Sequence, residues 1–240
     1  MVIGHPFINK IMIDWEKIPE DSYLREIEAL SGLTELPLSH AVTFFAGENG
    51  SGKSTLLEAI AVAYGFNPEG GTRNYHFSTY DSHSGLSDAL RLSRSARRPM
   101  GGYFLRAESF YNVATMEEEY SKGSALGSYG FHKKSHGESF LSVAQHYFRE
   151  DGIYLLDEPE AALSPQRLMT LLIEIHRCAE NGAQFIIVTH SPILLSLPEA
   201  EILSFDSGRI HPVSYEETDS YQVTAMFINH REQILKRLLS

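Results

Sequence analysis

The chain has 240 residues, 42% of them hydrophobic and 21% charged, so its composition is globular and excludes a disordered chain. Its 20 Lys and Arg against 31 Asp and Glu give a net charge of −11, which argues against general nucleic-acid binding because such binding rests on cationic neutralisation of phosphates. The single cysteine, Cys178, excludes an intramolecular disulfide. No apolar run reaches the roughly 18 residues that span a bilayer, and the N-terminus lacks a signal-peptide pattern. We therefore expect a cytoplasmic protein without a membrane segment.

Taken in chain order, the predicted elements alternate between strands and helices. Residues 1–40 predict N-terminal strands with a connecting loop, and residues 66–102 and 112–131 are polar stretches, the second of which predicts a mobile loop. Helices are predicted at 54–64, 138–149, 165–179 and near 223–239. Strands are predicted at 41–46, 103–105, 153–156, 185–189, near 201–204 and near 210–215. This alternation indicates an α/β protein with a mainly parallel sheet and helices on both faces.

The strongest motif is residues 47–54 (GENGSGKS), which match the phosphate-loop pattern and lie between a predicted strand and a predicted helix. Glycines let the backbone curl so that successive N–H groups point into one cavity, and the helix N-terminus adds partial positive charge. Lys53 is expected to reach the β- and γ-phosphates of ATP, Ser54 to offer its hydroxyl to Mg²⁺, and Thr55 to bond the α-phosphate. A glycine-rich turn without a ligand is the alternative, and the flanking elements argue against it. The expected nucleotide-binding residues are Gly47, Glu48, Asn49, Gly50, Ser51, Gly52, Lys53, Ser54 and Thr55.

A pair of carboxylates follows the apolar run at residues 153–156 (IYLL). Ligands of parallel sheets lie at the carboxyl ends of strands. Asp157 is therefore expected to hold Mg²⁺ through water, and Glu158 to polarise the attacking water as general base. Taken alone, the pattern is equally typical of the start of an acidic loop, but downstream of a phosphate loop it favours catalysis.

A histidine follows the apolar run at residues 185–189 (FIIVT). If this strand lies beside the other two, His190 faces the γ-phosphate and senses it through a hydrogen bond. A histidine at a strand end is on its own more typical of a structural residue. The order of the motifs favours the catalytic interpretation, with Lys53, Glu158 and His190 as the catalytic group.

Residues 135–139 (SHGES) open the helix predicted near residue 138. Ser135 and Gly137 are candidates to present a hydroxyl and backbone N–H groups to an anion at this helix N-terminus. An ordinary N-cap, with Glu138 interacting with the helix dipole, is the alternative.

In motif order the chain resembles the ABC-type ATPase superfamily over essentially its whole length. The resemblance implies a P-loop NTPase fold: an ABC-type ATPase head with a mainly parallel core sheet, N-terminal antiparallel strands and a short helical lobe. It implies one domain over residues 1–240, with the helical and signature lobe at residues 66–150. It also implies that the phosphate loop of one subunit and the signature motif of another sandwich ATP. Ser135 and Gly137 keep two positions of the family's Leu-Ser-Gly-Gly-Gln signature, His190 matches its switch histidine, and residues 160–164 (EAALS) match a segment that crosses the dimer interface.

Within the superfamily the chain is similar to the soluble heads of chromosome-maintenance, recombination-repair and defence ATPases, and to small stand-alone bacterial ATPases. This similarity implies that Arg73 reaches the nucleotide and that Glu108 occupies the family's Gln-loop position near the metal. A solvated loop residue is the alternative for Arg73. The short interval between Lys53 and Ser135 leaves no room for a long coiled coil, so a complete head without arms is expected.

An arginine stretch beside the nucleotide motifs makes DNA a candidate partner of this otherwise acidic chain. A solvated, arginine-rich helix face is the alternative. The stretch comprises Arg91, Arg94, Arg97 and Arg98, flanked by Arg73 and Arg106.

The favoured function is a soluble Mg²⁺-dependent ATPase that forms an ATP-dependent homodimer, uses hydrolysis as a conformational switch and acts with a partner effector protein. A second hypothesis is a regulatory or scaffold module that binds ATP and hydrolyses it slowly. A third is the energy subunit of a membrane transporter, against which the departures from the family signature at Lys134, His136 and Glu138 argue.

Overall fold

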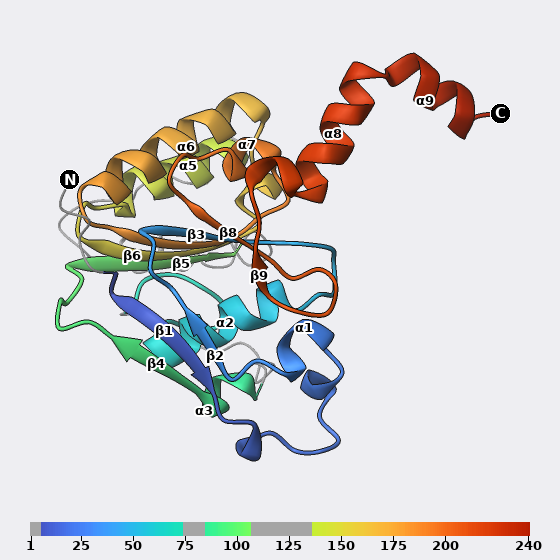
Figure 1. Ribbon diagram of the computed structural model, residues 1–240. Helices are drawn as coiled ribbons and strands as arrows, with labels where there is room; N and C mark the ends of the chain where they lie inside the picture. The colour runs from blue at the N-terminus through green and yellow to red at the C-terminus, as the bar shows by residue number, and fades with distance from the viewer. Residues whose placement is uncertain (1–5, 74–84, 107–135) are drawn as a thin grey trace.

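A six-stranded sheet forms the centre of the protein, as a computed structural model shows for residues 6–73, 85–106 and 136–240 (Figure 1). Its strand order is β5-β6-β7-β3-β8-β9. All pairings are parallel except that between β8 and β9. The strands are β3 (Val42–Ala46), β5 (Gly101–Arg106), β6 (Gly152–Asp157), β7 (Gln184–Val188), β8 (Glu201–Ser204) and β9 (His211–Pro212).

The three apolar runs that predicted buried strands are wholly buried in β3, β6 and β7. Continuous apolar runs suit these strands because both faces of the sheet are covered. Figure 1 shows α5 (His136–Tyr147) and α6 (Pro165–Glu180) over one face, and α2 (Lys53–Tyr64) with a smaller sheet on the other. The predicted α/β class with a mainly parallel core sheet is confirmed.

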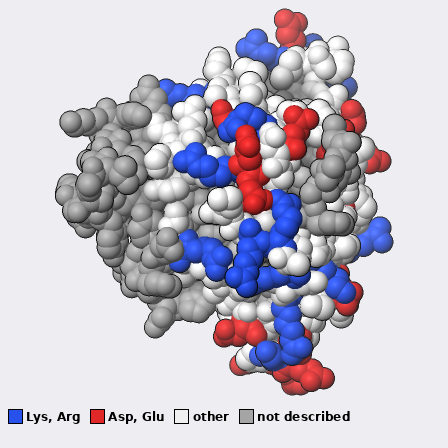
Figure 2. Space-filling view, turned by 90° about the vertical axis from the view of Figure 1, so that its left-hand side faces the viewer, with Lys and Arg blue, Asp and Glu red and all other residues white. Residues whose placement is uncertain are grey.

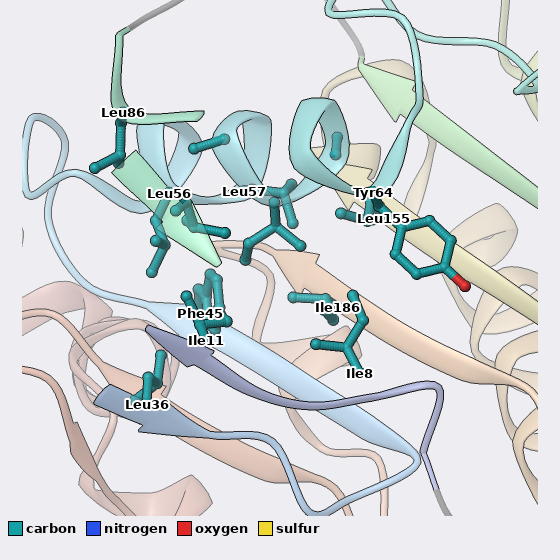
Figure 3. Close-up of a cluster of buried hydrophobic side chains, with 14 of the residues drawn as sticks. Ile8, Ile11, Leu36, Phe45, Leu56, Leu57, Tyr64, Leu86, Leu155 and Ile186 are labelled. Carbon is teal, nitrogen blue, oxygen red and sulfur yellow. The ribbon is translucent and has the colours of Figure 1, made fainter. Parts of the chain in front are cut away.

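The smaller sheet contains the expected N-terminal strands. Its order is β2-β1-β4, with β1 (Ile8–Ile13), β2 (Glu35–Pro37) and β4 (Leu90–Arg94) paired antiparallel. A buried cluster of apolar side chains joins this sheet to α2 and to the core sheet. Figure 3 shows side chains from all three parts in that cluster, including Ile11 of β1, Leu57 of α2 and Ile186 of β7. The small sheet and α2 therefore share one hydrophobic core with the strands that carry the motifs.

The covering helices are amphipathic where they meet the sheet. The buried residues of α6 are Leu168, Leu171, Ile175 and Cys178, which recur at helical spacing. Shorter elements connect the main ones. They are η1 (Trp15–Lys17), η2 (Tyr23–Arg25), α1 (Glu28–Ser31), α3 (Leu86–Ala89), η4 (Pro159–Ala162), α7 (Pro192–Leu195) and η5 (Tyr215–Glu217). Within the described ranges, no helix is long and apolar enough to cross a membrane.

The segment at residues 66–150 differs from the expected helical lobe. Its strands β4 and β5 belong to the two sheets of the body, because β4 pairs with β1 and β5 pairs with β6. The predicted loop at residues 112–131 lies outside the described residues. The division of the chain into one domain with an inserted lobe stays a prediction.

The C-terminal region also departs from the single helix predicted near residues 223–239. It forms α8 (Asp219–Asn229) and α9 (Arg231–Leu238), which are separated at His230, where ψ of 28° breaks the helical path. Figure 1 shows both helices projecting from the body, and neither contains a buried residue in the described chain. The strand predicted near 210–215 is shorter, because a capping box at Ser214 and Glu217 turns the chain into η5.

Candidate active site

The phosphate loop connects β3 to α2, as the sequence predicts. Gly52 ends it in the left-handed conformation, with φ of 98°, and α2 begins at the next residue. A Cβ atom at Gly52 would lie 2.6 Å from Cγ2 of Ile27, so only glycine fits there. The loop therefore delivers its backbone N–H groups to the N-terminus of a twelve-residue helix, where the helix dipole favours an anion.

Lys53 is buried at the centre of this loop, with 4% of its surface exposed. Its Nζ donates to the carbonyl oxygens of Gly47 and Glu48, at 2.8 and 2.6 Å, and to the hydroxyl of Ser51 at 3.4 Å. Burial lowers the pKa of the Lys53 ammonium below its ordinary value of 10.5, whereas nearby carboxylates, Asp206 first and then Glu158, raise it. All three N–H groups of the ammonium are therefore used within the loop, where phosphate oxygens would take the place of these acceptors.

Ser54 and Asp157 meet beside the loop. The Ser54 hydroxyl donates to Oδ1 of Asp157 at 2.8 Å, although the two residues come from α2 and from the carboxyl end of β6. Asp157 is buried, and Arg106 at the end of β5 lies 3.7 Å from its Oδ2. A hydroxyl and a carboxylate oxygen are ligands that Mg²⁺ accepts, so the two residues fit the expected metal. Thr55, in the first turn of α2, follows them and is half-buried.

Glu158 and His190 lie at the ends of neighbouring strands. Oε1 of Glu158 is 3.8 Å from Nε2 of His190, and the Glu158 N–H donates to the carbonyl of Val188 at 3.0 Å. Glu158 has the left-handed backbone conformation, with φ of 49°, which is costly for a non-glycine residue and clusters at functional sites. Among the described residues, buried Nε2 of His190 has no hydrogen-bond partner. Such an unsatisfied donor or acceptor suits a group that bonds a ligand.

Arg73 is not brought to this site. Its guanidinium lies 5.4 Å from the centre of the Tyr64 ring, at the C-terminal end of α2. At 1.5 Å of rise per residue, that end of the helix is about 16 Å from Lys53. This position corrects the expectation that Arg73 reaches the nucleotide bound by its own chain. The sequence interval between Lys53 and Arg73 did not predict this position. Helix α2 runs away from the phosphate loop, and Arg73 follows its distant, C-terminal end.

The signature region is described in part. Helix α5 begins at His136, so residues 136–139 open a helix as predicted, with Gly137 in its first turn. Ser135 and Glu108 lie outside the described residues, and their expected roles stay predictions.

The arginine stretch lies away from the phosphate loop. Arg97 pairs with Asp151 and donates to the carbonyl of Gly182, and these two partners lie next to the starts of β6 and β7. The phosphate loop follows the opposite, carboxyl end of parallel β3. The expectation of an arginine cluster beside the nucleotide motifs is therefore corrected.

The same arginines also exclude the alternative of a helix face. Arg91 and Arg94 lie on β4, where Arg91 pairs with Asp14 at 3.4 Å and Arg94 donates to the carbonyl of Ala63 at 2.7 Å. Arg98 is exposed in the connection to β5. Figure 2 shows Lys and Arg side chains gathered on one face of the protein. We call the surface of Arg94, Arg97 and Arg98 the arginine face.

The motifs missed a carboxylate that holds the phosphate loop. Asp206 follows β8, and its Oδ1 accepts a hydrogen bond from the N–H of Glu48 at 2.9 Å. A Cβ at Gly47 would lie 2.8 Å from the same oxygen, so the loop and the carboxylate are in close contact. The available signal was an apolar run that ends in a carboxylate, as at Asp157. This signal points to the phosphate loop only once β8 is known to pair with β3, which precedes that loop.

Comparison with known proteins adds two matching family models. Residues 23–127 match a model described as an AAA domain, and residues 128–196 match one described as "AAA domain, putative AbiEii toxin, Type IV TA system". The L-cystine transport system ATP-binding protein TcyN of Escherichia coli is 25% identical over 194 residues, which cover 70% of this chain and 77% of that protein.

Solved structures are similar at lower identity. An SMC head domain from Thermotoga maritima has 14% identity and a TM-score of 0.46, with 86% of this chain and 99% of that chain covered. An SmcHead bound to the C-winged helix domain of ScpA has 15% identity and a TM-score of 0.48, with 88% and 99% covered.

The strand–loop–helix unit and the groups around Lys53 define a nucleotide-binding protein of the P-loop class. Together with the matched AAA models and the transport ATPase relative, they indicate a P-loop ATPase of the ABC type, an enzyme that hydrolyses ATP.

Proposed function

We propose that the protein binds ATP with Mg²⁺ between two head-to-tail copies and uses hydrolysis as a conformational switch. The observation that carries the proposal is the convergence of Lys53, Ser54, Asp157, Glu158 and His190 at the carboxyl ends of three adjacent strands. Phosphoryl transfer needs mainly positioning and charge neutralisation, which these groups supply.

Each side chain has a separate task in this proposal. Lys53 holds the β- and γ-phosphates, and Glu158 accepts a proton from the attacking water as general base. His190 bonds the γ-phosphate through the nitrogen that lacks a partner in the described structure. Ser54 and Asp157 hold Mg²⁺, which when bound neutralises phosphate charge.

A second copy would cover the open side of the site. The side chains of Glu158 and His190 are 44% and 35% exposed, so one chain alone does not exclude water from the reacting groups. The signature residues of the other copy, of which 136–139 open α5, would close this side in the sandwich that the family resemblance implies. Loss of the γ-phosphate would then release the two copies, because both hold it.

The substitution Glu158→Gln tests this proposal. We expect the variant to bind ATP, to lose turnover by at least about 100-fold because the general base is gone, and to accumulate as a dimer with ATP on gel filtration. Lys53→Ala is the control, which should neither bind ATP nor dimerise. A Glu158→Gln protein that stays monomeric and hydrolyses ATP at the parent rate would contradict the proposal.

A second function, contact with duplex DNA or another polyanion, is supported by the arginine face (Figure 2). Because this face lies at the strand ends opposite the phosphate loop, it would stay accessible in a dimer formed through the nucleotide edge. An effector protein that uses the switch is the remaining partner that we propose.

A further inference from the structure

We infer that Glu160 is a positioning residue that fixes His190 relative to Glu158, so that nucleotide sensing and water activation share one rigid frame. The inference rests on the proposed function, because it assigns Glu160 a task in the hydrolysis that Glu158 and His190 perform. In this inference Glu160 contacts neither the nucleotide nor the attacking water. It acts through the backbone and side chains of its neighbours.

The contacts of Glu160 are made by one oxygen. Oε1 accepts a hydrogen bond from the hydroxyl of Thr189 at 2.8 Å and another from the N–H of His190 at 2.5 Å. The Thr189 hydroxyl in turn accepts from the N–H of Ser191 at 3.0 Å, and Thr189 is fully buried. A single carboxylate from η4 therefore holds Thr189 and His190 directly, and Ser191 through the Thr189 hydroxyl.

A second link connects the same two turns. The N–H of Glu158 donates to the carbonyl of Val188, so the backbone after β6 is fastened to the end of β7. Glu160 fastens it again two residues further along each chain segment. Two such links fix the position of the turn after β6 relative to the end of β7. A strained residue such as Glu158, with its left-handed backbone, persists where its surroundings fix it in this way.

The other oxygen of Glu160 indicates that stability alone does not account for this carboxylate. Oε2 is buried and, in the described part of the chain, has no hydrogen-bond partner. A buried polar atom without a partner costs free energy. The carboxylate is therefore better explained by the geometry that Oε1 imposes on His190 than by a contribution to folding.

Two conservative variants separate reach from charge. Glu160→Gln keeps an oxygen at the position of Oε1 but removes the charge, whereas Glu160→Asp keeps the charge but is shorter by one methylene. We expect Glu160→Asp to lower kcat about 10- to 100-fold, since a displacement of about 1 Å at a reacting group costs up to that factor. The affinity for ATP should stay within about three-fold of the parent, because the phosphate loop is not touched. Glu160→Gln should keep kcat within about three-fold, because a retained acceptor preserves the geometry.

The measurements are steady-state ATP turnover and the Kd of ATP for the whole chain, with thermal unfolding to confirm folding. Glu16→Asp, the same shortening at an exposed residue of η1, is the matched control. The inference is overturned if Glu160→Asp has the parent kcat, if Glu160→Gln loses as much as Glu160→Asp, or if both variants lose ATP binding in step with turnover.

Measuring the Glu158→Gln variant alongside the others distinguishes a failure of the proposed function from a failure of the inference about Glu160. If Glu158→Gln turns over ATP like the parent, the proposed function fails whatever Glu160 does. If Glu158→Gln is inactive and Glu160→Asp is as active as the parent, only the inference about Glu160 fails.

Discussion

Lys53 and Asp206 illustrate how single residues set the charge of the nucleotide site. Burial depresses the pKa of Lys53, and the Asp206 carboxylate is the first of the groups that oppose this depression. The same carboxylate accepts the N–H of Glu48 in the phosphate loop. Asp206 therefore acts on the site in two ways, by holding the loop and by favouring the charged form of its lysine.

This pairing predicts how ATP binding depends on pH. Lys53 binds phosphate as an ammonium, so affinity is full well below the pKa of Lys53 and is lost as pH rises towards it, in a range below the ordinary 10.5. Asp206→Asn keeps an acceptor for the loop but removes the charge, so its affinity should start to fall at lower pH than that of the parent. The Kd of ATP measured from pH 7 upward checks this. Asp219→Asn is the control, because Asp219 of α8 lines a pocket together with Asp206 and Glu48. Superimposable profiles for the parent and Asp206→Asn would refute the prediction.

At this scale the sequence predicted the site residues that a local motif carries. The loop at 47–52 and Lys53 lie in the strand–turn–helix unit that the motif predicts, and Asp157 and His190 lie at the ends of buried strands as expected. Their roles in hydrolysis stay predictions. Asp206 and Glu160 were not assigned their contacts, because each contact joins two segments distant in sequence. Arg73 was misplaced because spacing along the chain does not specify a direction in space.

Among the elements, β7 joins the two sheets of the protein through one side chain. The amide of Gln184 donates to the carbonyl of Ile8 and accepts from the Ile8 N–H, both at 2.9 Å. Gln184 and Ile8 are buried, so these bonds satisfy a backbone N–H and a carbonyl of Ile8 away from water. A polar residue at the start of an apolar strand therefore positions the N-terminal sheet on the core.

Gln184→Leu should destabilise the protein by about 2–4 kcal/mol, because it leaves one buried N–H and one buried carbonyl of Ile8 without partners. Urea denaturation followed by circular dichroism measures the free energy of unfolding. Gln166→Leu, the same change on the exposed side of α6, should alter it by less than about 0.5 kcal/mol. Equal effects of the two substitutions would show that the paired amide contributes nothing.

The strands were predictable because their composition reflects burial on both faces, as in β3, β6 and β7. Their order was not predictable from residue patterns, since β3 lies between strands made much later in the chain. The division of the C-terminal helix at His230 also escaped prediction. Neither part of that region is buried in the described chain, so no apolar periodicity marks where one helix ends.

For the whole molecule, the net charge of −11 does not show that charge differs between the two edges of the core sheet. One edge carries Lys53 among carboxylates, and the other carries the arginine face, at the strand ends opposite the phosphate loop. In the proposed function a nucleotide and a polyanion would therefore not compete for surface.

Arg94→Glu combined with Arg98→Glu should weaken binding of duplex DNA while leaving ATP turnover unchanged. The slope of log affinity against log salt should fall by about one for each arginine that contacts a phosphate. Fluorescence anisotropy with a labelled duplex, over a salt series, gives the slope. Arg231→Glu with Arg237→Glu on α9 reverses the same amount of charge elsewhere. The prediction is wrong if the parent shows no salt-dependent binding, or if both pairs weaken it equally.

The central place of β3 has a consequence for the order of events during synthesis. Its partners β7 and β8 come from residues 184–188 and 201–204, so β3 leaves the ribosome long before either neighbour exists. Until then, the apolar strand VTFFA has both edges open and is prone to pair with other chains. The frame that holds the phosphate loop is complete only when residue 206 has emerged, since Asp206 bonds that loop. We therefore expect nucleotide to bind only after residue 206 has emerged, and the apolar strand to need protection until its neighbours have been made.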